Sequence, residues 1–231
     1  FKGKADLVHE VRLVKRTEAS WGEAVFRGLW LPPGARLHEP PMRPSRRILF
    51  WGDSLACGYG VEGRDPLCPG CRDLENVEKS YAGLLTRELQ AESQVVAWSG
   101  KGLLRNYGDP APRSEEPLPV YGERIVASRP ETVWDPSGWR PRLIVVELGS
   151  NDFSTEPSPD PREWVQAYAA LLRNFRRRFP EAALLCAADG TTGLLGTCVK
   201  EAVQRIKAEG LCDVSWHPWE KFNIREMGCD Y

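Results

Sequence analysis

The stretch that decides the fold is Ile48-Leu49-Phe50-Trp51-Gly52-Asp53-Ser54, four apolar residues followed by a glycine, an acid and a hydroxyl. A short apolar run of this kind is typical of a strand buried on both faces of a parallel sheet. Ser54 directly follows this strand, so we expect it at the carboxyl edge of the sheet, where open α/β sheets bind their ligands. Ser54 is therefore the first candidate nucleophile.

Similar apolar runs recur along the chain and alternate with helical patterns. The expected strands are Ile48–Trp51, Gln94–Trp98, Leu143–Leu148, Ala183–Ala187 and, more weakly, Asp213–Trp216. The expected helices are Ser80–Ala91, Pro161–Phe179 and Thr197–Glu209. This alternation predicts a three-layer α/β/α domain, with a parallel sheet between two layers of helices.

The start of the longest expected helix carries a clear signal. Asp160 and Glu163 have the spacing of a capping box, and Pro161 occupies the first helical position. Apolar residues then recur at helical spacing until Pro180, which cannot continue a helix. The sequence therefore predicts a helix whose apolar face packs on the sheet.

The first 43 residues have a different character. Asp6–Lys15 and Gly22–Leu31 have the β-branched, partly alternating pattern of strands, and Pro40–Pro44 resembles a stiff linker. Two or three antiparallel strands cannot bury their own apolar face. We therefore expect residues 1–43 to be the last strands of a β-sandwich domain with its linker, and residues 44–231 to form the α/β domain.

Composition limits the classes of partner. The 231 residues include 31 basic and 32 acidic side chains, which give a formal net charge of −1. This balance argues against nucleic acid as the main partner, because nucleic-acid-binding domains usually carry a basic excess. No apolar run approaches the roughly 18 residues that a membrane-spanning helix needs, and the start at Phe1 shows no signal peptide. We expect neither nucleic acid nor a membrane as a partner.

Seven cysteines leave the redox compartment open. The Cys68-Pro69-Gly70-Cys71 motif has no second CxxC to complete a four-thiolate zinc site. A disulfide bond or free thiols in a surface insertion are therefore favoured over a metal or redox role. Cys57, one turn beyond Ser54, is expected to behave as a small buried hydrophobe. We predict no metal and no other cofactor.

Three of the expected strand ends carry residues suited to acyl transfer. Ser54, Gly100 and Asn151 each follow one of the first three strands. Because the carboxyl ends of parallel strands meet at one edge, we expect these residues to converge. Attack by the Ser54 hydroxyl on an ester would create an oxyanion. The backbone N–H groups of Ser54 and Gly100 and the Asn151 amide are suitable donors for it.

These motifs resemble the signature blocks of the SGNH (GDSL-type) hydrolases, whose domain is flavodoxin-like. More narrowly, the chain is similar to carbohydrate esterase family 2, acetyl-sugar deacetylases in which a jelly-roll domain precedes the SGNH domain. The matching segments are Val11–Glu18, Trp51–Gly60, Ser99–Gly108, Trp134–Pro141, Val145–Asp152 and Gly228–Asp230. The resemblance covers most of the chain and implies that residues 1–43 are the last jelly-roll strands.

The resemblance also implies roles for individual residues. Ser54 would be the nucleophile, and Gly100 and Asn151 would complete the oxyanion hole. The last family block has an aspartate two residues before the catalytic histidine. Asp230 occupies the aspartate position, so the histidine is expected directly after Tyr231. Without this base a serine is a poor nucleophile, and we expect the chain as given to show little or no turnover.

Three further residues are candidates for the same site. Tyr107, in the loop after Gly100, is a candidate wall for the substrate. His217 follows the last expected strand, and an ordinary loop histidine is favoured there over a catalytic base. Asp53 is expected to accept backbone N–H bonds in the tight turn rather than to act as an acid or base.

The sequence thus predicts a serine esterase that removes O-acetyl groups from acetylated sugars or polysaccharides through an acyl-serine intermediate. One alternative is a catalytically silent carbohydrate-binding protein that keeps the SGNH fold. Another is an SGNH lipase or thioesterase, which would need an apolar groove around Ser54. The resemblance implies secretion, whereas the sequence itself leaves localisation and oligomeric state open.

Overall fold

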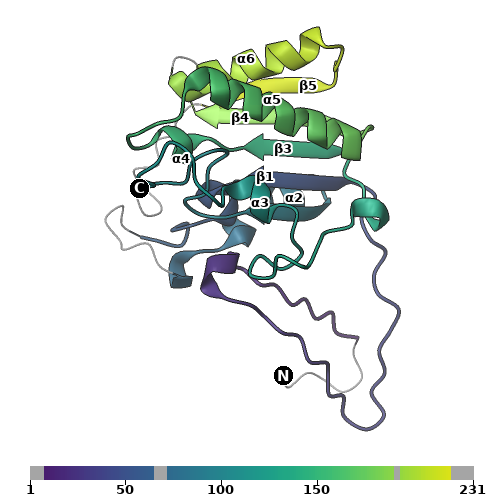
Figure 1. Cartoon of the computed structure of the whole chain (residues 1–231). Helices are drawn as coiled ribbons and strands as arrows, with labels where there is room; N and C mark the ends of the chain where they lie inside the picture. Colours follow the sequence, from purple (N-terminus) through teal and green to yellow (C-terminus); the bar gives the residue numbers. More distant parts are fainter. Residues whose placement is uncertain (1–7, 65–71, 190–192, 220–231) are drawn as a thin grey trace.

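The computed structural model of the chain describes residues 8–64, 72–189 and 193–219. Its centre is a sheet of five strands: β1 (Arg47–Gly52), β2 (Glu92–Ala97), β3 (Leu143–Glu147), β4 (Ala183–Asp189) and β5 (Val214–Trp219). The strands lie in the order β2-β1-β3-β4-β5, and every neighbouring pair is parallel (Figure 1). This is the flavodoxin-like order, as the sequence predicts.

Helices cover both faces of the sheet (Figure 1). The main ones are α2 (Tyr81–Glu88), α5 (Pro161–Arg178) and α6 (Leu194–Ala208), and three short helices are α1 (Ser54–Cys57), α3 (Leu118–Tyr121) and α4 (Ser150–Phe153). Successive residues of β1 point to opposite faces. Phe50 packs edge-on against Tyr81 of α2, and Trp51 against Phe175 of α5. Burial on both faces explains the uninterrupted apolar run of β1.

All five expected strands and all three expected helices are present, with ends that differ by a few residues. The expected capping box is only half formed. Asp160 Oδ1 accepts the N–H groups of Arg162 and Glu163 at 2.9 and 3.0 Å. The Glu163 side chain does not return to the cap but accepts a bond from Arg113 Nε at 2.7 Å. Glu163 therefore accepts a bond from a distant cation in place of the N–H of the cap residue.

The N-terminal segment extends away from the sheet layers (Figure 1). Among its described residues the only regular element before β1 is the 3₁₀ helix Ala19–Trp21, so the strand expected at Gly22–Leu31 and the described part of the one expected at Asp6–Lys15 are absent. A strand needs a partner for its backbone hydrogen bonds, and neither segment pairs with a strand among the described residues. Apolar side chains remain exposed, with Trp30 at 86%. The assignment of residues 1–43 to a β-sandwich stays a prediction.

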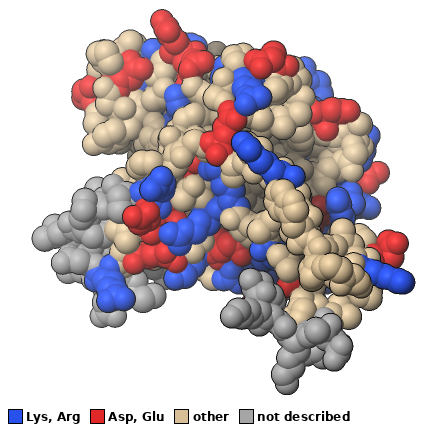
Figure 2. All heavy atoms as spheres, turned by 90° about the horizontal axis from the view of Figure 1, so that it is seen from below, with Lys and Arg blue, Asp and Glu red and all other residues tan. Residues whose placement is uncertain are grey.

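Charges of both signs are interspersed over the surface. Figure 2 shows lysine and arginine mixed with aspartate and glutamate on the face seen from below. Many form ion pairs, such as Arg173 with Glu209 at 2.6 Å. Within the described ranges no helix combines the length and the apolar character needed to cross a membrane.

Candidate active site

Ser54 lies where β1 passes into α1. Asp53 caps the helix, and its Oδ1 accepts the N–H of Leu55 at 3.2 Å, which confirms its expected role in the turn. The backbone N–H of Ser54, the first helical residue, has no acceptor within the helix. A Cβ on Gly52 would lie 2.9 Å from the Glu147 carbonyl oxygen, so glycine permits the close packing of this turn. The serine is thereby presented at the sheet edge, with its backbone N–H outside the hydrogen bonds of α1.

Asn151 lies in α4, directly after β3. Its amide nitrogen donates to Asp53 Oδ2 at 3.2 Å and to the Lys101 carbonyl oxygen at 3.0 Å. Ser150 Oγ donates to the same Asp53 oxygen at 2.6 Å. One carboxylate therefore ties the turn after β1 to the turn after β3.

The turn after β2 carries Gly100. Its φ of +77° lies in the left-handed region that favours glycine, and its carbonyl oxygen accepts the N–H of Tyr107 at 2.8 Å. The following backbone is held by the Asp152 carboxylate, which accepts the N–H groups of Leu103 (2.8 Å), Leu104 (2.7 Å) and Arg105 (3.0 Å). Burial raises the pKa of Asp152, and these three donors oppose that shift. Asp152 thus organises the loop that carries Gly100.

The three candidate residues meet at one edge of the sheet. Asp53 contacts both Ser54, at 3.5 Å, and Asn151, while Lys101 links Asn151 to the turn of Gly100. In the order β2-β1-β3 the connections leave β1 and β3 in opposite directions, and ligands of such sheets bind at this switch point. The convergence expected from the sequence is therefore present, and the catalytic roles remain predictions.

Of the other sequence candidates, Tyr107 lies beside Gly100, His217 lies apart from this convergence, and Asp230 lies outside the described residues. Tyr107 is 63% exposed on the loop after Gly100. His217 lies within β5 rather than after it, and three strand spacings, about 14 Å, separate β5 from β1. This position does not support His217 as a base for Ser54. Asp230 and the Cys68–Cys71 motif fall outside the described residues.

Sequence reasoning missed Arg105, whose side chain is fully buried. Its guanidinium donates to the carbonyl oxygens of Asp109 (2.6 Å), Ala111 (3.1 Å) and Thr155 (2.8 Å). A planar group with five donors can join several loop carbonyls at once. Arg105 therefore shapes the loop that presents Tyr107, and its place in the matching segment Ser99–Gly108 was the available signal.

Sequence reasoning also missed Glu18 and Glu75. Glu18 Oε2 accepts the backbone N–H of Ser99 at 2.6 Å, directly beside Gly100. The N–H of Glu18 in turn donates to Glu75 at 2.5 Å, and Trp21 Nε1 donates to Glu75 at 2.6 Å. Burial raises the pKa of Glu75. The N-terminal segment is thus bonded to the turn that carries the candidate oxyanion glycine.

Cys57 is buried, as expected, but it lies against two carboxyl groups. Glu18, Cys57 and Glu75 bring potential metal ligands within 4.8 Å of one another. Burial, and after it Glu18, raises the pKa of the thiol well above its ordinary value. Because N–H donors already satisfy both carboxylates, these hydrogen bonds account for the arrangement.

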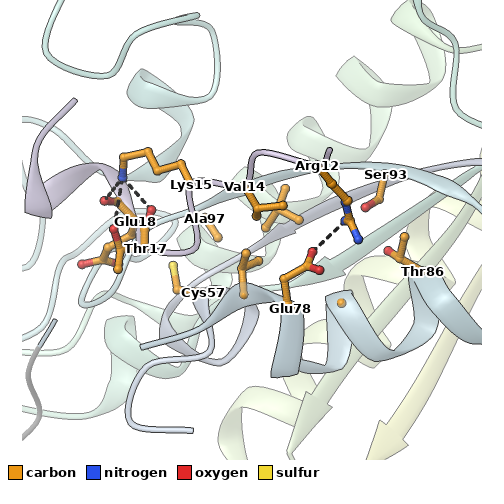
Figure 3. A pocket seen from close by; sticks show the side chains of 13 residues that line it. Arg12, Val14, Lys15, Thr17, Glu18, Cys57, Glu78, Thr86, Ser93 and Ala97 are labelled. Carbon is orange, nitrogen blue, oxygen red and sulfur yellow. Dashed lines mark hydrogen bonds and ion pairs between the residues drawn. The ribbon is translucent and has the colours of Figure 1, made fainter. Parts of the chain in front are cut away.

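A cavity of about 290 Å³ lies between the N-terminal segment, α2 and β2 (Figure 3). Its polar rim is internally paired: Arg12 binds Glu78 at 2.9 Å, and Lys15 Nζ donates to the carbonyl oxygens of Thr17 and Glu18, both at 2.6 Å. Ser54, Gly100 and Asn151 do not line it. The cavity is therefore separate from the candidate active site.

Comparison with known proteins connects this geometry to a family. The profile of the GDSL-like lipase/acylhydrolase family matches residues 50–210, the region that supplies Ser54, Gly100 and Asn151. The chain belongs to this family. A cellulase/esterase, CelE, of Acetivibrio thermocellus is 39% identical over 189 residues, which are 80% of this chain and 22% of that protein. An acetylxylan esterase/glucomannan deacetylase of Cellvibrio japonicus is 28% identical over 235 residues, 91% of this chain and 64% of the relative.

Solved structures give the same result. A family two carbohydrate esterase from Clostridium thermocellum, in complex with cellohexaose, aligns with a TM-score of 0.77 at 31% identity, covering 85% of this chain and 61% of that one. A Corynascus thermopiles family 2 enzyme with a carbohydrate-binding domain aligns with a TM-score of 0.75 at 27% identity, covering 94% and 68%. The predicted SGNH fold is confirmed, and the chain spans less than two thirds of the two relatives named above and of the C. thermocellum esterase.

Proposed function

We propose that this chain is the esterase part of a protein that removes O-acetyl groups from acetylated polysaccharides. The observation that carries the proposal is the convergence of Ser54, Gly100 and Asn151 at the switch point of the sheet, held there by Asp53 and Lys101. The family match and the similarity to acetylxylan esterases support an ester of a sugar as the substrate.

In the proposed reaction the Ser54 hydroxyl gives its proton to a base and its Oγ bonds to the acetyl carbon. The backbone N–H groups of Ser54 and Gly100 and the Asn151 amide donate to the resulting oxyanion. The bond to the sugar oxygen then breaks, and the base returns the proton to that oxygen. Water hydrolyses the acetyl-serine to acetate by the same route. In this proposal the base is the histidine that the family pattern places after Tyr231.

One rearrangement is part of this proposal. The Asn151 amide nitrogen is directed at two protein acceptors, so donation to an oxyanion requires one of these bonds to open. The bond to Asp53, at 3.2 Å, is the longer of the two. Hydrogen bonds of this kind often reach their catalytic geometry only in the substrate complex.

The test is hydrolysis of p-nitrophenyl acetate and acetylated xylan by the protein extended to its natural ends. Ser54→Ala should lose at least about a thousandfold in kcat, and Asn151→Ala about a hundredfold to a thousandfold. Ser137→Ala, on an exposed turn, is the matched control and should keep full activity. An inactive wild type that still binds xylan would favour the silent binding protein, and preference for p-nitrophenyl palmitate would favour a lipase.

A further inference from the structure

Two carboxyl groups are buried side by side beneath the candidate site. Asp53, which follows β1, is 0% exposed, and Glu147, the last residue of β3, is 3% exposed. The strands pair so that Gly52 lies opposite Glu147, which places the two side chains on adjacent strand ends. Both carboxyl groups are shielded from water, and each affects the ionisation of the other. Two buried carboxylates side by side repel each other when both are ionised, so this arrangement favours a proton on one of them.

The surrounding donors identify which one. Asp53 receives hydrogen bonds from four groups: Leu55 N–H (3.2 Å), Ser54 Oγ (3.5 Å), Ser150 Oγ (2.6 Å) and Asn151 Nδ2 (3.2 Å). Oε2 of Glu147 is buried and receives no bond from a described residue. Donors favour the ionised form of an acid, and burial without donors favours the neutral form. Burial raises the pKa of Asp53 as well, but its donors oppose that shift, whereas burial and the Asp53 charge together raise the pKa of Glu147 well above its ordinary value. The arrangement therefore favours Asp53 as the anion and Glu147 as the acid.

Among the described residues, the titratable groups that interact with the pair carry no positive charge. Glu147 interacts electrostatically with Asp53, Tyr81 of α2 and Tyr168 of α5, and Cys57 of α1 interacts with Asp53 and Tyr81. Burial raises the pKa of Tyr81, Tyr168 and Cys57, so these groups are neutral at neutral pH. Burial and then the Asp53 charge raise the pKa of Glu147 well above its ordinary value. In this part of the chain a proton is therefore the available means of neutralising the second carboxyl group.

We propose that Asp53 and Glu147 hold one proton between them, and that Glu147, as a neutral acid, fixes Asp53 as the acceptor that positions Ser54 and Asn151. Both are positioning residues, since neither is placed to touch the substrate. The proton also keeps the charge of the pair at −1 and not −2 beside the oxyanion, which like charges would destabilise. The positioning half of this inference rests on the proposed function, whereas the shared proton does not.

The shared proton is tested by unfolding Glu147→Gln and the wild type in urea between about pH 5 and pH 8. In the unfolded chain Glu147 is already mostly ionised at about pH 5, whereas the native pair keeps its proton, so native wild type binds about one proton more over this range. Its folding equilibrium constant should then fall about tenfold per pH unit relative to Glu147→Gln, until the pair itself loses the proton. Glu181→Gln, an exposed control, should follow the wild type. If the ratio of the folding equilibrium constants of the wild type and Glu147→Gln did not change with pH, the proposal would be overturned.

The positioning role is tested by kcat and KM for p-nitrophenyl acetate in the protein extended to its natural ends. Glu147→Gln keeps a neutral donor to Asp53 and should retain kcat within about threefold, whereas Glu147→Ala should lower kcat about tenfold to a hundredfold with KM little changed. Equal losses in both variants would overturn the positioning role. An inactive wild type would instead refute the proposed function, and the urea measurement would still decide the shared proton.

Discussion

Replacing Asp152 should remove the main support of the loop that carries Gly100. The carboxylate is fully buried and accepts three backbone N–H bonds of 2.7 to 3.0 Å from Leu103, Leu104 and Arg105. In Asp152→Ala all three donors lose their acceptor. Each buried donor without a partner costs about 1–3 kcal/mol. Because the loop can relax toward water, we expect a total loss of about 4 kcal/mol and not the simple sum.

Asp152→Asn should fall between the wild type and Asp152→Ala. The amide keeps one oxygen acceptor but turns an N–H group toward donors and removes the charge that strengthens all three bonds, so we expect a loss of about 2 kcal/mol. For a chain of this size, 1 kcal/mol shifts the melting temperature by about 2–4 °C. The expected shifts are therefore about 8–16 °C for alanine and about 4–8 °C for asparagine.

Urea unfolding followed by tryptophan fluorescence, with thermal melts by circular dichroism, would measure both losses. Asp213→Asn replaces an exposed aspartate and serves as the control, which should stay within about 0.5 kcal/mol of wild type. If Asp152→Ala also remained within about 1 kcal/mol of wild type, the argument that its three bonds hold the loop would be refuted.

Three further predictions concern the loop after β2, the Glu18–Ser99 bond and the start of α5. Gly102→Ala should cost about 3 kcal/mol in urea unfolding, because its Cβ would meet the Arg105 carbonyl oxygen at 1.9 Å, while Gly138→Ala, which meets nothing within 4 Å, should be nearly neutral. Glu18→Ala should cost about 2 kcal/mol and speed hydrogen exchange at the Ser99 amide, and unchanged exchange would contradict the Glu18 bond. Asp160→Ala should cost about 1 kcal/mol through loss of the α5 cap, whereas Glu163→Ala, which removes only an exposed ion pair, should change thermal stability little. Equal losses would contradict the half-formed box, because they would show that Glu163 also caps the helix.

The sheet and the convergence of the candidate site were predictable because both follow from local pattern. An apolar run such as Leu143–Glu147 can be buried only between two layers, and the residues after parallel strands must share an edge. Periodicity likewise identified α5, whose Trp164 and Phe175 lie on its buried face. Local pattern therefore sufficed wherever neighbours in sequence decided the outcome.

The remaining features depend on partners far along the chain. The bond from Ser99 to Glu18 joins residues 81 positions apart, and no local sequence pattern predicts it. Glu147 ends an apolar strand, and the influence of Asp53 on its pKa depends on the pairing of β1 with β3, which the sequence alone does not specify. The capping box failed for the same reason, because Arg113 competes for Glu163 from a distant loop.

The bond between Glu18 and Ser99 bears on where the hydrolase domain begins. Pro40–Pro44, expected from the sequence to be a linker, suggests a start at residue 44, yet a domain that began there would leave behind the acceptor of the Ser99 N–H, one residue from Gly100. A gene fusion made at this point would therefore lose Glu18. A recombination point upstream of Arg12 would keep Glu18 and the Arg12–Glu78 ion pair with the hydrolase. The folded unit of this chain thus includes residues on the N-terminal side of its first strand.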